Sequence, residues 1–323
     1  MLPTFVTDTT QESAEARKPR IAVTIPCYNE AVTIAKVIAD FRAVLPDAKI
    51  YVFDNNSTDD TAHVARSAGA IVRSETQQGK GHVVRRIFAD IEADIYIMAD
   101  GDDTYDASLA PTLVDLLQKN HVDMIVGTRA GVTEDAGRGG HAFGNALFNR
   151  FYHILFGDKF TDIFSGYRVF SRRFVKSFPA VSTGFEIETE MSVHCSQLGI
   201  PTLERPTPYG VRPEDSESKL RTFRDGLRIL GMFAMLAKET RPAAFFGAIG
   251  LALILCALGL FAPVAMTYAQ TGEVPRLPTA ILSMGLVITA TVSTVCGLIL
   301  DSLARARIEA KRSVFLSFRS PEW

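Results

Sequence analysis

The sequence predicts an α/β domain with a mostly parallel central sheet, joined to a membrane-spanning helical hairpin. Two observations support this prediction. In the first half of the chain, short apolar runs alternate with helical patterns, which is typical of parallel sheets covered by helices. Towards the C-terminal end, two long stretches contain no charged residue. The chain has 323 residues, which is enough to bury a large core.

Five apolar runs predict the strands of this sheet, at residues 20–26, 49–54, 70–73, 94–100 and 122–127. Helical patterns lie between them, from Glu30 to about Val44, up to about Ser67, from Gly81 to Ala89 and up to about Lys119. Ser57, with Asp60 three residues on, predicts a capping box that opens the second helix. In such sheets ligands bind at the carboxyl ends of the strands, so the loops there are the candidate site.

Composition and missing motifs exclude several classes of protein. The net charge of −2 and pI near 6.3 argue against binding nucleic acid through bulk charge. The four cysteines lie far apart without a CxxC motif, which excludes a zinc ribbon and a disulfide scaffold. The first strand is followed by PCYNE rather than GxGxxG, and Gly79-Lys80 lacks the flanking residues of a P-loop.

The C-terminal part predicts two transmembrane helices, at about 243–269 and 277–300. The uncharged stretches have 27 and 24 residues, and each exceeds the roughly 20 residues that cross a bilayer. A short polar link, QTGEVPR, separates them. The alternative is a pair of buried core helices, but a soluble core helix rarely runs this long without a charge. The stretches therefore predict a multi-pass hairpin in residues 243–323, ending in a basic tail.

Basic residues on both sides of the hairpin predict its orientation. Arg221, Arg224, Arg228, Lys238 and Arg241 precede it, and Arg305, Arg307, Lys311 and Arg312 follow it. By the positive-inside rule both ends are expected in the cytoplasm, with residues 1–219 forming a cytosolic domain. The N-terminal segment lacks the pattern of a signal peptide. Residues 220–242 mix arginines with apolar residues, which predicts an amphipathic helix in the headgroup layer or, alternatively, one packed on the domain.

Acidic residues stand directly after two of the predicted strands. Asp54 ends the second, and Asp100, Gly101, Asp102 and Asp103 follow the fourth. Clustered carboxylates repel one another unless a cation or hydrogen-bond donors balance them. A divalent ion that also bridges a substrate diphosphate would do so, although acidic turns are also common on solvated surfaces. The pattern favours a metal–diphosphate site.

At these residues the sequence resembles the family 2 glycosyltransferases, which have the GT-A nucleotide-sugar fold, and among them the polyprenyl-phosphate glycosyltransferases that include dolichol-phosphate mannose synthase. The matching segments, in order, are IPCYNE (25–30), FDNNSTDDT (53–61), GKG (79–81), ADGDD (99–103), VGTR (126–129), FTDIFSGYRVFSR (160–172), GFEIETE (184–190) and RPEDSESKL (212–220). They cover nearly the whole expected cytosolic domain.

The resemblance implies a pocket for a nucleotide-diphosphate sugar and for Mg²⁺ or Mn²⁺. Its implied residues are Pro26, Tyr28, Asn29, Glu30, Asp54, Lys80, Asp100, Gly101, Asp102, Glu188 and Glu190. Asp54 would accept the base imide N–H, and Asp102, with Asp100, would hold the metal. Thr104 stands where the family often has a glutamine ligand, which leaves Asp103 as a substitute. For Glu188 and Glu190 the alternative is that acidic residues favour a helix start.

The resemblance also implies a site for the acceptor, the phosphate group of a polyprenyl lipid. Arg168, Arg212, Ser218 and Lys219 are its implied residues, and Arg129 joins Asp100, Asp102, Arg212 and Lys219 in the implied catalytic set. The loop that carries Arg212 and Lys219 is expected to close over donor and acceptor. For any single arginine the alternative is a solvated surface charge.

The expected function is inverting transfer of a sugar, preferably from a UDP-hexose, to a polyprenyl phosphate at the cytoplasmic face of the inner membrane. The alternatives are a GDP-mannose-dependent mannose synthase and a non-catalytic membrane-anchored sensor of nucleotide sugars. A processive polysaccharide synthase is disfavoured because its QxxRW motif is absent. The expected partners are the nucleotide sugar, the polyprenyl phosphate and the bilayer, without nucleic acid, and a homo-oligomer is left open.

Overall fold

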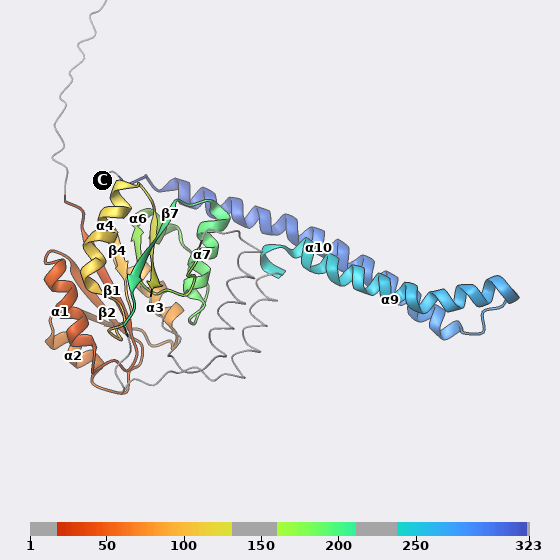
Figure 1. Cartoon of the computed structure of the whole chain (residues 1–323), viewed down its shortest axis with the longest axis horizontal. Coiled ribbons are helices and arrows are strands. Elements are labelled where there is room, and N and C mark those ends of the chain that lie inside the picture. The colour runs from red at the N-terminus through yellow and green to blue at the C-terminus, as the bar shows by residue number, and fades with distance from the viewer. Residues whose placement is uncertain (1–17, 131–159, 211–237, 322–323) are drawn as a thin grey trace, which may run out of the picture.

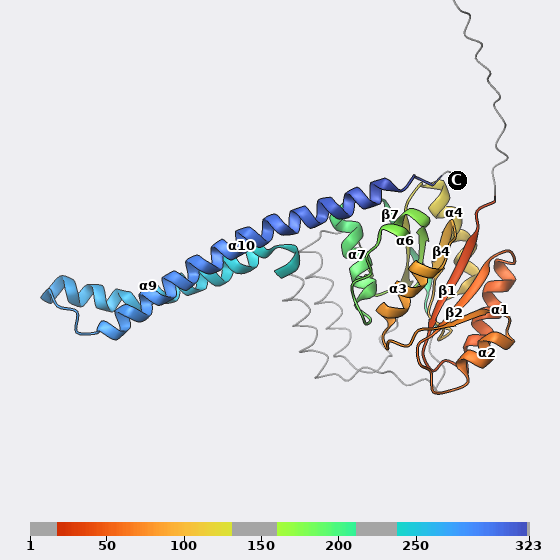
Figure 2. The ribbon, with the colours of Figure 1, turned by 180° about the vertical axis from the view of Figure 1, so that it is seen from behind.

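The computed structural model describes residues 18–130, 160–210 and 238–321. These residues form an α/β domain from which a long helical hairpin projects (Figure 1). The view from behind shows the same two parts (Figure 2). Residues 211–237, which hold most of the expected amphipathic helix, lie outside the described residues.

The domain is built on a seven-stranded sheet with the order β3-β2-β1-β4-β6-β5-β7. Its strands are β1 (Ile21–Cys27), β2 (Lys49–Asp54), β3 (Ile71–Ser74), β4 (Ile95–Met98), β5 (Met124–Ala130), β6 (Arg168–Ser171) and β7 (Thr202–Pro208). The first four pair in parallel, whereas β6 runs antiparallel between β4 and β5. The mostly parallel sheet is thus confirmed, and all five expected strands are present. Two further strands, β6 and β7, are additional to the five expected ones.

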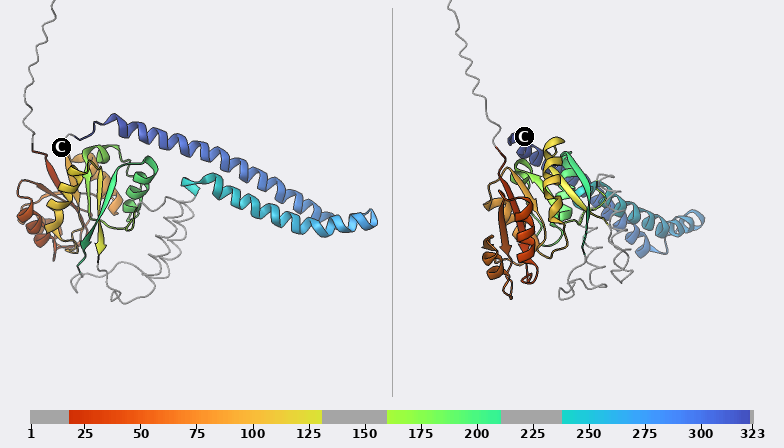
Figure 3. Two further views of the ribbon diagram at one scale, coloured as in Figure 1. Left: turned by 45° about the horizontal axis from the view of Figure 1, so that its top comes forward. Right: turned by 60° about the vertical axis from the view of Figure 1, so that its left-hand side comes forward.

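Helices cover both faces of the sheet, as two views of the domain show (Figure 3). On one face α1 (Ile34–Val44), α2 (Thr61–Ser67), the 3-10 helix Ala107–Leu109 and α4 (Ala110–Lys119) bury one apolar cluster. On the other face α3 (Lys80–Asp90), α6 (Arg172–Ser177) and α7 (Ile187–Leu198) bury a second cluster. The expected helices therefore lie where the alternating pattern placed them. Both clusters keep the sheet rigid, which fixes the loops at its strand ends.

The start of α2 differs from the expected capping box. Ser57 Oγ accepts a hydrogen bond from the backbone N–H of Asn29 instead, at 3.0 Å, and Asp60 makes no side-chain cap. Asp59 takes the capping role, since its Oδ1 accepts from the backbone N–H of Thr61 at 3.0 Å. The prediction was wrong because Ser57 joins two loops at the sheet edge rather than the helix.

The hairpin consists of α9 (Pro242–Thr271) and α10 (Leu277–Ser317), each long and apolar enough to span a membrane. Small residues let the two helices approach closely. A Cβ on Gly250 would lie 2.6 Å from Thr294 Oγ1, and one on Gly297 would lie 2.8 Å from Phe246 Cβ. The residues of the expected basic tail after Leu300 continue α10, which runs to Ser317.

Candidate active site

The acidic residues selected from the sequence lie together at the carboxyl ends of neighbouring strands, which form one edge of the sheet. β1 pairs with both β2 and β4, so the loops after these strands flank the end of β1 at Cys27. Burial raises the pKa of the Cys27 thiol well above its ordinary value, and the charges of nearby carboxylates add to this shift. Those carboxylates belong to Glu30, Asp100, Asp54 and Asp102. The edge therefore carries a concentrated negative charge.

Asp54, the last residue of β2, presents an unsatisfied acceptor. Its side chain is 8% exposed, and its buried Oδ1 has no hydrogen-bond partner among the described residues. The next residue, Asn55, is fixed, since its amide donates to the carbonyls of Glu75 and Gln77 and its Oδ1 accepts from the N–H of Gly79. A buried oxygen left without a partner is costly, so this atom suits a donor brought by a ligand.

The turn after β4 holds Asp102 in a defined position. Asp102 is 2% exposed and accepts a hydrogen bond from Thr104 Oγ1 at 2.6 Å. Gly101 is required in this turn, because a Cβ there would lie 2.7 Å from Cys27 Sγ. Asp103 has a φ of 59° and pairs with Lys36 Nζ of α1 at 2.8 Å. Thr104 thus orients Asp102, while Asp103 is held by another helix.

Lys80, at the start of α3, joins Asp100 to α7. Its Nζ lies 2.5 Å from Asp100 Oδ1 and 2.5 Å from Glu188 Oε1. Burial alone would lower the pKa of Lys80, but the two carboxylates outweigh burial and raise it. Burial raises the pKa of Glu188, against the effect of Lys80, and Glu188 Oε2 has no hydrogen-bond partner in the described part of the chain. The cluster holds one positive charge between two carboxyl groups.

Glu190, two residues after Glu188 in α7, positions a neighbouring loop. Its carboxylate accepts from the backbone N–H groups of Val181 and Ser182, at 3.0 and 2.7 Å. This loop lies against the GKG segment, where the N–H of Gly81 donates to the carbonyl of Thr183 at 3.1 Å. A Cβ on Gly81 would lie 2.1 Å from the carbonyl oxygen of Ser182, which explains the glycine. Glu190 therefore supports the site through the loop.

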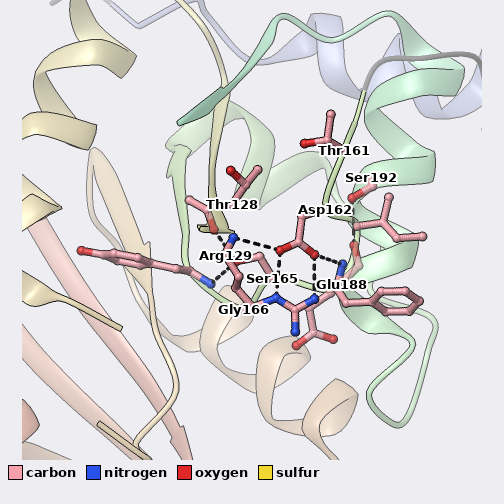
Figure 4. A network of polar contacts seen from close by, with 12 residues as sticks. Thr128, Arg129, Thr161, Asp162, Ser165, Gly166, Glu188 and Ser192 are labelled. Carbon is pink, nitrogen blue, oxygen red and sulfur yellow. Dashed lines mark hydrogen bonds and ion pairs between the residues drawn. The ribbon is translucent and has the colours of Figure 1, made fainter. Parts of the chain in front are cut away.

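Arg129 forms an ion pair with another side chain of the domain. Its Nε and Nη2 donate to the two carboxylate oxygens of Asp162, each at 2.8 Å, as Figure 4 shows at its centre. Burial by itself raises the pKa of Asp162, but the hydrogen bonds and charge of Arg129 hold it below its ordinary value. The guanidinium carbon also lies 5.7 Å from the ring centroid of Tyr209. This bidentate pair fixes the end of β5 beside the loop before β6.

Arg168 lies in the core of the domain. It is fully buried, and its guanidinium donates to the carbonyls of Ser165 and Ile163 and to Ser192 Oγ. A solvent-borne phosphate does not reach a guanidinium enclosed in this way, so we remove Arg168 from the acceptor site. Its physical role is to satisfy the carbonyls of the loop that precedes β6.

The remaining residues of the expected nucleotide pocket lie around the end of β1. Pro26 is buried within the strand, Tyr28 and Glu30 are half-buried, and Asn29 is exposed with a φ of 55°. Asn29 Oδ1 accepts from the N–H of Thr58 at 2.8 Å, which joins the loops after β1 and β2. Arg212, Ser218 and Lys219, with the loop expected to close, lie outside the described residues.

Two residues of the site were missed by sequence reasoning. Asp162, the partner of Arg129, lies 33 residues away from it in the chain. Tyr105 accepts a hydrogen bond through its hydroxyl from the N–H of Gly166 at 2.8 Å and lies beside Tyr167 at 5.3 Å between ring centroids. Asp162 stands in a matched segment, FTDIFSGYRVFSR, but spacing gives no indication of its partner.

The turn after β4 offers two carboxylate groups that suit a hard divalent cation. Two carboxylates do not complete the coordination shell of such an ion. Asp102 supplies a buried carboxylate and Asp100 a half-buried one. Within residues 18–130, 160–210 and 238–321, no group of three histidine, cysteine or acidic side chains is arranged to hold a metal. Such a site needs further oxygens, from water or from a diphosphate.

Asp54 at the end of β2 and Asp100, Asp102 and Asp103 after β4 put the acidic residues of this α/β domain at the carboxyl ends of its parallel strands. Residues 22–178 match the family model described as glycosyl transferase family 2. Glycosyltransferase AglJ of Haloferax volcanii is 39% identical over 242 residues, covering 74% of this chain and 79% of that protein. The chain belongs to glycosyltransferase family 2, and it is a glycosyltransferase.

Two further proteins extend the comparison. The dolichyl-phosphate hexose transferase of Haloferax volcanii is 28% identical over 222 residues, covering 68% of this chain and 95% of that protein. Glucosyl-3-phosphoglycerate synthase of Mycobacterium tuberculosis, solved with Mn²⁺, uridine diphosphate and phosphoglyceric acid, superposes with a TM-score of 0.54. It is 22% identical and covers 68% of this chain and 78% of that chain, a likeness that shows the fold.

Proposed function

We propose that this protein transfers a hexose from a nucleotide-diphosphate sugar to a polyprenyl phosphate, with inversion at the anomeric carbon. The observation that carries the proposal is one chain that combines the carboxylates of Asp54, Asp100 and Asp102 at a sheet edge with a hairpin of membrane-spanning length. The site suits an anionic donor bridged by a cation, and the hairpin suits an acceptor that stays in a bilayer.

The nucleotide is proposed to bind between the loops after β1 and β2. Asp54 Oδ1, which has no hydrogen-bond partner among the described residues, would accept a hydrogen bond from the imide N–H of the base. The buried oxygen would then have a hydrogen-bond donor. Pro26 lies near the end of β1, and Tyr28, Asn29 and Glu30 belong to the loop that follows it. A UDP-hexose is our preferred donor, supported by a solved neighbour that contains uridine diphosphate. GDP-mannose is the alternative, because a carboxylate accepts from either base.

Asp102 and Asp100 would hold Mg²⁺ or Mn²⁺, which when bound neutralises the diphosphate leaving group. Within the chain, Thr104 keeps the Asp102 carboxylate oriented by its hydrogen bond. Lys80 holds Asp100 against Glu188, so the position of Asp100 depends on α3 and α7. Glu188 Oε2 accepts no hydrogen bond from the described residues and is proposed to bind a sugar hydroxyl.

The lipid phosphate is proposed to attack C1 of the sugar directly. A phosphate monoester carries negative charge near neutral pH, so it attacks without first losing a proton, and no catalytic base is needed. The enzyme then acts by orienting the two substrates and stabilising charge. Arg212, Ser218 and Lys219 are our proposed phosphate ligands from the sequence, and Arg129 supports the site through its pair with Asp162.

We place the catalytic domain on the cytoplasmic side of the inner membrane. The support is the basic residues on both flanks of the hairpin, which include Lys238 and Arg241 before α9 and Arg305 and Arg307 after the apolar part of α10. Polyprenyl phosphate presented at that face would meet the domain directly.

The test is a donor panel with the purified full-length chain in liposomes that contain undecaprenyl phosphate. UDP-hexoses and GDP-mannose are offered with Mg²⁺ or Mn²⁺, and the lipid product is identified by mass spectrometry. We expect one nucleotide sugar to give a lipid-linked monosaccharide, and the Asp102→Asn variant, which we expect to lose transfer, is the control. Tight binding of a nucleotide sugar without any lipid product would contradict the proposal and favour a sensor.

A further inference from the structure

The cytosolic part of α10 lies against the catalytic domain. The uncharged stretch ends at Leu300, yet the helix runs on to Ser317 without a break. Figures 1 and 2 show this part passing alongside α7 and α6, and both helices contact it. The hairpin is therefore joined to the domain by a packed helix as well as by the chain that leads into α9.

Side chains in residues 308–315 of α10, which we call the docking segment, take part in this contact. Phe315 is 7% exposed and belongs to the apolar cluster beneath α6 and α7, and Ile308 packs against the same cluster. Arg312 Nη1 donates to the carbonyl of Leu198, at the end of α7, at 3.2 Å. The adjacent Leu316 is 63% exposed, so burial is confined to one face of the helix.

The docking segment rests on parts of the domain that are themselves fixed. The guanidinium carbon of Arg173 lies 4.4 Å from the ring centroid of Phe315, and Arg173 Nη2 lies 2.5 Å from Asp123 Oδ2. Asp123 is buried and directly precedes β5. At the other end of α7, Glu188 holds Lys80 of the active site. One rigid helix therefore separates the docking segment from the active site.

We propose that residues 301–315 act as a spacer of fixed length that holds the active site at a set height above the bilayer. Ile308 follows Leu300 by eight residues, which is about 12 Å along a helix. A phosphate anchored in the headgroup layer meets the donor only if the site lies at the matching depth, and small misplacements cost large factors in rate. Phe315 is then a positioning residue. This inference rests on the proposed lipid acceptor.

The experiment compares two kinds of variant of the full-length protein. Inserting seven alanines between Ala306 and Arg307 adds about two helical turns, or roughly 10 Å, and nearly restores the helix face. Phe315→Ser removes the buried anchor, Phe315→Leu is its conservative partner, and Leu316→Ser is the matched exposed control. Transfer is measured to undecaprenyl phosphate in liposomes and to a short-chain, water-soluble polyprenyl phosphate. Nucleotide-sugar affinity is measured by calorimetry, and docking by hydrogen exchange of residues 308–315.

We expect the insertion to leave exchange protection, nucleotide affinity and short-chain transfer near wild type, while liposome transfer falls about tenfold or more. Phe315→Ser should lose both the exchange protection of residues 308–315 and the transfer to liposomes. Phe315→Leu should keep both, and Leu316→Ser should behave as the wild type does. If the insertion variant transfers sugar to liposomes at the wild-type rate, the spacer proposal is wrong. It is also wrong if the insertion lowers the transfer rate equally for both acceptors. Failure of the proposed function looks different: the wild type then transfers to neither acceptor, although residues 308–315 remain protected.

Discussion

The edge of the sheet that carries the site and the α9–α10 hairpin are specified in different ways. At the site, single atoms decide the arrangement, such as the Thr104 hydroxyl on Asp102 and the Lys80 ammonium between Asp100 and Glu188. In the hairpin, most apolar side chains face outward, and the close contacts fall at small residues such as Gly250 and Gly297. Substitutions at the site should therefore act through chemistry, and those in the hairpin through side-chain volume at a few positions.

The largest effect is expected at the site, from Asp102→Asn. The amide keeps the size and can still accept from Thr104, but it loses the charge that a metal–diphosphate complex needs. Transfer should fall about 100-fold or more with the fold unchanged. Initial rates at saturating metal, with circular dichroism as the folding control, provide the measurement. A rate within about threefold of wild type would remove Asp102 from the metal site.

Arg168→Ala tests whether a predicted phosphate ligand is instead part of the core. The change leaves the carbonyls of Ser165 and Ile163 without donors and opens a cavity. We expect a loss of about 3 kcal/mol in the free energy of unfolding. Thermal melting of the full-length protein in detergent measures the loss, and Arg172→Ala at an exposed arginine is the matched control. An unchanged melting temperature with weaker acceptor binding would restore the phosphate role.

Gly250→Leu tests the hairpin by volume. The new side chain would collide with Thr294 and the backbone at Ala290, so the helices must separate, at a cost of about 1–3 kcal/mol. Gly259→Leu should be silent, because a Cβ added at Gly259 would have no neighbouring atom within 4 Å. Cysteine cross-linking between α9 and α10 in membranes measures the separation. Equal cross-linking in both variants would show that the contact at Gly250 is dispensable.

The smallest effect is expected at the margin of the site, where Asp59 replaces the predicted cap. Asp59→Ala removes hydrogen bonds from the N–H groups of Ala31 and Thr61, and we expect a loss of about 1 kcal/mol. Asp60→Ala should have almost no effect, because Asp60 makes no side-chain cap. Melting temperatures of the two variants distinguish them. A larger loss from Asp60→Ala would support the capping box that the sequence predicted.

The sequence alone determined the features that depend on local pattern. Uncharged runs of more than twenty residues specify the hairpin, because a charge is costly in a bilayer. Alternating strand and helix patterns specify the parallel sheet, and they place Asp54, Asp100 and Asp102 at the strand ends where ligands bind. These positions follow from neighbours in the chain, so they could be predicted one segment at a time.

Which charged side chains meet depends on how distant parts of the chain pack together. Arg129 and Arg168 look alike in the sequence, yet one pairs with Asp162 and the other is enclosed by carbonyls. Glu188 reaches Lys80, and Phe315 reaches the core beside α6, across long stretches of chain. The physical reason is that burial and charge pairing depend on packing between distant elements. Residue type and spacing describe what a side chain is able to do, and the folded chain selects its partner.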